Sequence, residues 1–109
     1  MDAKGTETGG QLTMAQQHTV GTHRTTVKTI GTKTIVRYHS TDVVMFDPLW
    51  ITLNNGGFYT ATTKLRMNQT ASQFGLGYRV YQRNYEWYVD LPNGDTVRMD
   101  SRKFTFKRR

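Results

Sequence analysis

A chain of 109 residues that carries a formal charge of +7 and no cysteine is long enough for one domain with one core. The lack of cysteine excludes disulfides, thiolate nucleophiles and cysteine-bound zinc or iron–sulfur centres. No apolar run approaches the roughly 18 residues that cross a bilayer, and the N-terminus lacks the pattern of a secretion signal, so we expect a soluble domain with no membrane partner.

Residues 1–18 contain scattered apolar positions with no period of two or of 3.6, and we interpret them as a flexible leader. His18 and His23 lie at its end without a third ligand at a suitable spacing, so we expect no metal and no cofactor. The domain is expected to span residues 19–106 and to be followed by a basic C-terminal end, residues 107–109.

The first half of the domain is typical of β-strands, because threonine and β-branched residues alternate around turn residues. A turn at Gly31-Thr32 predicts a hairpin that sets Val27 opposite Val36. The predicted strands are Thr25–Ile30, Lys33–Tyr38, Val43–Phe46 and Leu49–Leu53.

One segment, Ala61–Phe74, has the length and pattern of a helix, and Gly75 ends it. Thr60 is the preferred N-cap, with Thr62 or Thr63 as alternatives if the helix begins later. A helical wheel predicts that one side is buried and that it includes Asn68, whose amide must then find partners. The apolar residues of that side are Ala61, Leu65, Met67, Ala71 and Phe74. The opposite side is expected to face solvent, and its residues are Thr62, Thr63, Arg66, Gln69, Thr70 and Gln73.

Two clearly alternating strands follow the helix, Tyr78–Arg83 and Glu86–Leu91. Their expected register sets Val80 opposite Val89 on the inner face. On the outer face it pairs Arg79 with Asp90, Tyr81 with Tyr88, and Arg83 with Glu86.

A third strand, Thr96–Asp100, follows the turn residues Pro92–Asp95. Keeping its apolar residues on the inner face requires a loop of three or five residues, with Gly94 in the left-handed conformation. The alternation of Phe104 and Phe106 indicates a last edge strand that ends near residue 106. We therefore predict a single α+β domain in which a bent antiparallel sheet of about seven strands packs on one helix, in the order β-β-β-β-α-β-β-β.

Much of the positive charge is at the C-terminal end, where residues 98–109 hold six basic residues against Asp100, a net charge of +5. An exposed basic end is expected to contact phosphate groups, and a solubilising, frayed terminus is the alternative.

Two further constellations have a functional and a structural interpretation. The start of the helix, where Gly56 and Gly57 precede Thr60 and Lys64, could bind an anion, although capping explains the same residues. His39 near Asp42 could form a general base, although turn-locking hydrogen bonds are the favoured explanation, with Asn68 fixing the helix on the sheet.

Two surfaces could contact nucleic acid. Arg79, Tyr81, Arg83 and Tyr88 could stack bases and contact phosphates, although cross-strand ion pairs compete for the arginines. The polar side of the helix, which includes Arg66, could enter a major groove or simply be solvated.

Four strings of the sequence resemble a family of small, functionally uncharacterised bacteriophage proteins. They are Tyr38–Val44, Leu53–Phe58, Thr60–Lys64 and Arg66–Gln69, and the resemblance covers about residues 36–91. It implies a phage gene product that acts inside an infected bacterium, and it supplies no activity, cofactor or catalytic residue.

Our hypothesis is a non-enzymatic phage accessory protein in the host cytoplasm that binds DNA, RNA or another polyanion. The expected contact residues are Lys64, Arg66, Arg79, Tyr81, Arg83, Arg102, Lys103, Lys107, Arg108 and Arg109. The alternatives are a protein-interaction module that inhibits a host or defence factor, and a minor virion component. A small enzyme that depends on His39 and Asp42 is the third hypothesis.

Overall fold

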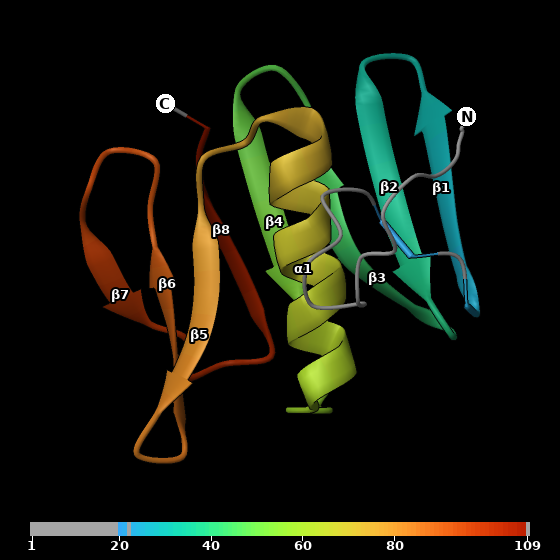
Figure 1. Cartoon of the computed structure of the whole chain (residues 1–109). Coiled ribbons are helices and arrows are strands. Elements are labelled where there is room, and N and C mark those ends of the chain that lie inside the picture. The colour runs from blue at the N-terminus through green and yellow to red at the C-terminus, as the bar shows by residue number, and fades with distance from the viewer. Residues whose placement is uncertain (1–19, 22, 109) are drawn as a thin grey trace, which may run out of the picture.

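The computed structural model describes residues 20, 21 and 23–108, so the predicted leader lies outside the described residues. Figure 1 shows a helix in front of a larger sheet, with a smaller sheet beside it. The described residues form one helix and eight strands in the order β-β-β-β-α-β-β-β-β. The predicted α+β class is confirmed, and the predicted element order matches with one strand added at its end, the one indicated by Phe104 and Phe106. The single bent sheet that we predicted is instead two antiparallel sheets, of five and three strands.

Five antiparallel strands form the larger sheet, in the order β1-β2-β3-β4-β8. Gly31 adopts a left-handed φ of 61° in the first turn, and Val27 pairs with Val36 as predicted. The strand bounds are β1 Thr25–Ile30, β2 Lys33–Tyr38, β3 Thr41–Phe46, β4 Trp50–Asn54 and β8 Lys103–Lys107.

Three antiparallel strands form the smaller sheet, β5 Arg79–Arg83, β6 Glu86–Asp90 and β7 Thr96–Arg98. The predicted β5–β6 register is confirmed, with Val80 opposite Val89. The loop between Asp90 and Thr96 has an odd number of residues, and Gly94 within it has a φ of 98°. Both features were predicted, because an odd number of loop residues keeps the apolar residues of the next strand on the inner face.

The strands divide into two sheets because the chain crosses from β7 to the far edge of the larger sheet through residues 99–102. Met99 N donates to Trp87 O at 2.9 Å, and Asn55 N donates to Arg102 O at 2.9 Å. The crossover is thus tied to both sheets, and it delivers β8 to the free edge of β4, where Phe106 pairs with Ile51. Lys107, which we expected to begin the basic C-terminal end, is therefore the last residue of strand β8. It is paired within the sheet and is not part of a frayed end.

The β2–β3 pairing contains a shift in register between Val36 and Arg37. The shift accommodates one extra residue in β3, so that Val43 and Val44 are both buried although they are neighbours on one strand. Beyond the shift, Arg37 lies opposite Asp42.

Helix α1, Ala61–Phe74, begins and ends as predicted. Thr60 Oγ1 accepts a hydrogen bond from Thr63 N, and Gly75 ends the helix in the left-handed conformation. Asn68 holds the helix to β5, because its amide donates to Val80 O and accepts from Val80 N, both at 2.8 Å. The sequence-based expectation that Asn68 fixes the helix on a sheet is confirmed.

The prediction of a solvated polar side of α1 is wrong. Thr63, Arg66, Gln69 and Thr70 are all buried, whereas Ala61 on the predicted inner side is exposed. The helical-wheel prediction assumed that a single surface packs against the helix. In the structure α1 packs against β2 and β3 on one side and against β5 on another. The Val20-Gly21 segment also contacts the helix, through hydrogen bonds to its glutamines.

The core lies between α1 and the inner faces of the two sheets. Trp87 is its largest fully buried apolar side chain. The other buried apolar residues are Val36, Val43, Val44, Phe46, Ile51, Leu53, Met67, Ala71, Leu76, Tyr78, Val80, Val89, Met99 and Phe106.

Candidate functional site

The side of the larger sheet that faces away from α1 is an open surface, which we call the outer face. On each strand its residues alternate with the buried ones, and the pairing aligns them into rows across the sheet. One row runs from Lys28 through Ile35, Met45 and Thr52 to Thr105. The remaining members of the outer face are Thr26, Ile30, Lys33, Arg37, Asp42, Trp50, Asn54, Lys103 and Lys107.

The outer face is strongly basic. It carries Lys28, Lys33, Lys103 and Lys107, and within the described residues none of these four lysines forms an ion pair. Arg37 and Asp42 neutralise each other, as described next, and the charge of Lys33 also acts on the Asp47 carboxylate of the β3–β4 turn. The face therefore presents four lysines whose charge is not neutralised by direct contact.

Arg37 Nε and Asp42 Oδ1 form a 2.7 Å ion pair on the outer face. The hydrogen bond from the guanidinium to the carboxylate is the main reason why the pKa of Arg37 is raised above its ordinary value. This pairing also removes Asp42 from the proposed base with His39, whose side chain lies on the opposite face of the sheet at the start of α1.

The centre of the outer face is apolar. Ile35 and Met45 are half-buried at the middle of the sheet, Ile30 is 61% exposed, and Trp50 is 45% exposed. Thr52 and Thr105 hydrogen-bond to each other across β4 and β8, with their hydroxyl oxygens 2.9 Å apart. Ile35 and Met45 therefore lie between the lysines, and Ile30 and Trp50 extend this apolar patch to the ends of β1 and β4, opposite Lys33 and Lys107.

Two hollows mark the ends of this patch. One of about 460 Å³ lies over β1 and β2, and its lining includes Lys28, Ile30, Ile35, Arg37 and Asp42. The other, of about 250 Å³, is lined by Pro48, Leu49, Trp50 and Lys107.

The β3–β4 turn sets the position of Trp50. The Asp47 carboxylate accepts hydrogen bonds from Leu49 N at 2.8 Å and Trp50 N at 2.7 Å. These two bonds are the main reason why the pKa of Asp47 is lowered, and the charges of Lys33 and Arg108 act in the same direction. The Asp47 carboxylate thus stabilises the turn and fixes the backbone of Trp50, whose ring lies on the outer face.

The predicted site on the smaller sheet is present but nearly neutral. Tyr81 and Tyr88 stack with ring centroids 5.8 Å apart, and the guanidinium of Arg79 lies 4.7 Å from the Tyr81 ring centroid. At the other end, the guanidinium of Arg83 lies 5.3 Å from the Tyr88 centroid. The four side chains therefore form one continuous stack.

Acidic residues offset the arginines of that surface. Arg79 pairs with Asp90 at 3.3 Å, as the register predicted. Glu86 pairs with Arg98 at 3.2 Å instead of with Arg83, which lies opposite it in the register. A hydrogen bond from Thr96 is the main cause of the lowered pKa of Asp90, and the hydrogen bond to Glu86 raises the pKa of Tyr88.

Arg66 does not contribute to a surface, so its assignment as a nucleic-acid contact is wrong. It is 1% exposed, its Nε donates to Thr25 Oγ1 at 2.9 Å, and its Nη1 donates to Gln69 Oε1 at 3.2 Å. Its guanidinium also lies 5.5 Å from the ring centroid of Tyr38. Its partners are neutral oxygens and an aromatic ring, which fits an arginine that connects the helix to β1 and β2.

The other predicted contacts are scattered. Lys64 donates to Gln82 Oε1 at 3.3 Å and lies over Trp87, between α1 and the smaller sheet. Arg108 donates to Asp47 O at 3.1 Å and covers the ring of Phe46. Arg102 is exposed on the crossover, and Arg109 lies outside the described residues. Lys103 and Lys107 are the predicted contacts that lie on the outer face.

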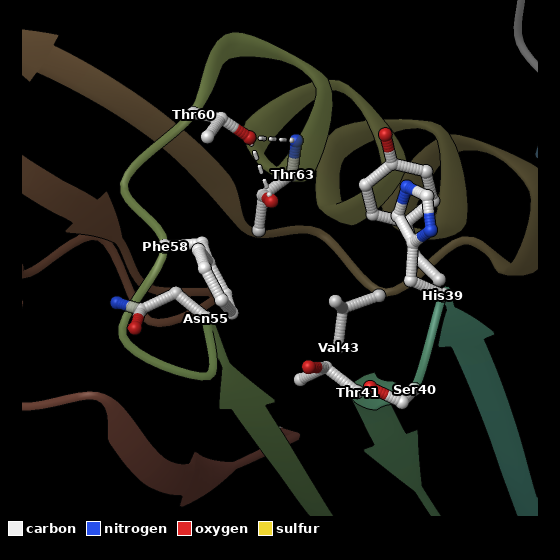
Figure 2. Close-up of a pocket in the computed structure, with 9 residues that line it drawn as sticks. His39, Ser40, Thr41, Val43, Asn55, Phe58, Thr60 and Thr63 are labelled. Carbon is white, nitrogen blue, oxygen red and sulfur yellow. Dashed lines mark hydrogen bonds between the residues drawn. The ribbon is translucent and has the colours of Figure 1, made fainter.

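A cavity of about 310 Å³ lies at the start of α1 and brings together two of the predicted constellations (Figure 2). His39 faces the N-cap residue Thr60 and the first-turn residue Thr63 across it, and the two threonine hydroxyls are hydrogen-bonded to each other at 2.9 Å. The ring of Phe58 points into the cavity, whereas the amide of Asn55 is turned away from it. No carboxylate lines the cavity, so the geometry offers His39 no acid–base partner there.

Neither a metal site nor a membrane span is found in the described part of the chain. No three histidine, aspartate or glutamate side chains within residues 20, 21 and 23–108 gather in a way that could hold a metal ion. The helix formed by these residues is not long and apolar enough to cross a bilayer.

Sequence reasoning missed Lys28, Lys33 and Trp50. The signal that could have identified the lysines is the period of two within Thr25–Ile30 and Lys33–Tyr38, which places each lysine on the side opposite Val27 and Val36. Their combination with Lys103 and Lys107 could not be inferred, because it depends on β8 joining β4.

Comparison with known proteins gives one family. Residues 6–108 match a family model described as Kyanoviridae Gp96 protein. No curated protein and no solved structure matches the chain.

Proposed function

The chain belongs to the Kyanoviridae Gp96 protein family, a family of phage proteins, and on this premise we propose that it is a non-enzymatic accessory protein that binds nucleic acid through the outer face. The observation that carries the proposal is the charge of this face, with Lys28, Lys33, Lys103 and Lys107 unpaired within the described residues. It acts in the infected host cell, and a place in the virion is the alternative.

The arrangement of the lysines supports a polyanion as the ligand. Lys28 and Lys33 lie on β1 and β2, and Lys103 and Lys107 lie on β8 at the other edge. With about 4.8 Å between neighbouring strands, the two edges are about 19 Å apart. A ligand with one charge could reach one pair of lysines, whereas a chain of phosphates can contact both edges and release counterions at each.

The outer face is favoured over the smaller sheet because of charge. The stacked arginines and tyrosines of the smaller sheet lie among Glu86, Asp90 and Asp100, which pair with Arg79 and Arg98. Binding a phosphate at Arg79 or Arg98 would require breaking these pairs, which leaves Arg83 as the arginine of that surface without an ion pair within the described residues. The lysines of the outer face are available without any such loss.

The two surfaces can be separated with matched double variants. Lys103→Ala with Lys107→Ala removes two cations four residues apart on β8, and Arg79→Ala with Arg83→Ala removes two with the same spacing on β5. Fluorescence anisotropy with a labelled oligonucleotide at several salt concentrations reports the affinity and its salt dependence. We expect the β8 variant to reduce the slope of log K against log salt by about 1 to 1.5, because each lost single-strand contact removes about 0.7.

The β5 variant is expected to leave both the affinity and the slope near the wild-type values. Equal losses in the two variants, or a loss in the β5 variant alone, would contradict the assignment of binding to the outer face. Absence of any association at low salt would contradict nucleic-acid binding altogether.

A second candidate function is binding of a host protein through exposed aromatic residues. Phe58 is 64% exposed, Tyr59 is 50% exposed and Tyr85 is 94% exposed, and these residues lie in loops beyond the ends of the strands. Aromatic residues are enriched at protein interfaces. If this candidate is correct, the affinity for a purified host partner should fall in the Tyr85→Ala variant. The same affinity should be unchanged in the β8 variant.

A further inference from the structure

The apolar centre of the outer face has no role in binding phosphates alone. Ile35 and Met45 lie between the lysines, and Ile30 and Trp50 lie at strand ends directly opposite Lys33 and Lys107. Trp50 remains 45% exposed. A duplex presents its phosphates outward and keeps its bases stacked inside, so it would cover these side chains without offering them an apolar partner. A single strand offers both phosphates and the faces of its bases.

We propose that the outer face selects single-stranded nucleic acid and that Trp50 is the residue on which a base stacks; this inference rests on the proposed function. Lys107 lies directly opposite Trp50 on β8, and Lys33 lies two strands away from Trp50, at about 10 Å. A base on the indole ring therefore has Lys107 directly beside it for a flanking phosphate. On the other side the charge of Lys33 is shared with the Asp47 carboxylate, which binds the Trp50 N–H.

The local structure keeps Trp50 in place for this role. Its backbone N–H is held by Asp47, and its strand pairs with β3 on one side and β8 on the other. The hollow of about 250 Å³ beside it is lined by Pro48, Leu49 and Lys107, with Leu49 69% exposed. A stacked base would meet an aliphatic side chain and a cation at this hollow as well as the indole.

Tryptophan fluorescence provides a direct test on the full chain. The chain has two tryptophans, and Trp87 is 2% exposed, so quenching by an added oligonucleotide reports on Trp50. We expect oligo(dT) to quench the emission and a hairpin duplex of equal phosphate content to quench it far less. Anisotropy at the same salt concentration should show tighter binding of the single strand.

Two substitutions at the same position make the test specific. Trp50→Ala should weaken single-strand binding by roughly 5- to 150-fold, the equivalent of one lost base-stacking contact, and should change duplex binding little. Trp50→Phe retains an aromatic ring and should restore most of the affinity. Tyr85→Ala, which removes an exposed aromatic residue elsewhere, is the matched control and should bind like the wild type. Thermal unfolding of each variant verifies that it folds.

The possible failures are distinguishable. If single strands, duplexes and heparin bind equally and Trp50→Ala changes none of them, the outer face is a general polyanion surface and the inference is overturned while the proposed function stands. If none of these probes binds at low salt, the proposed function fails and the inference fails with it.

Discussion

At the scale of single residues, the interior of this domain uses polar groups as connectors. Asn68 satisfies both backbone groups of Val80, and Tyr78 donates its hydroxyl hydrogen to Met67 O at 2.6 Å. Tyr78 is 5% exposed, and burial raises the pKa of its phenol well above the ordinary value. These side chains link β5 and the residue before it to the helix.

The phenol of Tyr78 makes the stability of the domain sensitive to alkaline pH. In the unfolded chain a tyrosine releases its proton near pH 10, whereas the buried phenol of the folded state retains it. The folded state therefore loses stability as the pH rises above about 10, and it is unaffected by this group at lower pH.

Tyr78→Phe tests this linkage by urea denaturation. At pH 7 the variant should be less stable by about 1 kcal/mol, because it lacks the hydrogen bond to Met67 O. Near pH 11 the difference should vanish, since the wild type loses about 1.4 kcal/mol for each pH unit above its unfolded-state pKa. Tyr85→Phe, at a 94% exposed position, should follow the wild type at every pH. A constant difference between Tyr78→Phe and the wild type would show that the phenol does not titrate in this way.

The structural roles predicted for single residues were confirmed where those roles depend on neighbouring residues alone. Thr60 caps the helix and Gly75 ends it, because these preferences depend on backbone groups within one turn. Arg66 could not be placed in the same way. A guanidinium at the middle of a polar helix side is ordinarily solvated, and its burial depends on residues as distant in sequence as Thr25 and Gly21.

At the scale of elements, the start of the domain is fastened to α1 by glutamines one turn apart. Val20 N donates to Gln73 Oε1 at 2.8 Å, and Gly21 N donates to Gln69 Oε1 at 3.0 Å. Beneath this segment lies the guanidinium of Arg66, and a Cβ atom on Gly21 would lie 2.6 Å from its Nη1 atom. The glycine is thus required by the close approach of the segment to a buried cation.

A double-mutant cycle tests this packing. Gly21→Ala should cost about 1 to 2 kcal/mol of the free energy of unfolding, because the guanidinium is held by Thr25 and Gln69 and cannot move away freely. In an Arg66→Ala background the same change should cost less than about 0.5 kcal/mol, since the clash is gone. The free energies come from urea denaturation of the four proteins. Equal costs in the two backgrounds would show that the strain at Gly21 does not come from Arg66.

Strand alternation was sufficient to predict the β1–β2 and β5–β6 hairpins and their registers. Val27 opposite Val36 and Val80 opposite Val89 follow from turn chemistry and the period of two. The helix wheel was less informative because several elements cover α1. The extra residue at Val43 was also beyond prediction, since two adjacent valines fit a buried strand equally well without a bulge.

At the scale of the whole molecule, the open surfaces of the two sheets differ in charge. The smaller sheet pairs its arginines with Glu86 and Asp90, and the larger sheet leaves Lys28, Lys33 and Lys107 unpaired within the described residues. Positive net charge was evident from the sequence, but its division between surfaces was not. That division follows from the crossover that carries β8 to the far edge of the larger sheet, a contact between segments about 50 residues apart.

Protein NMR with an isotope-labelled full chain tests the central claim most directly, since each backbone amide reports whether a ligand lies near it. On titration with oligo(dT) at low salt, we predict the largest shifts at Lys28, Lys33, Trp50, Lys103 and Lys107, with the indole N–H of Trp50 among them. Signals from Arg79–Arg83 and Glu86–Asp90 should change little. Shifts confined to those two strands, or no shifts at saturating oligonucleotide, would contradict binding at the outer face.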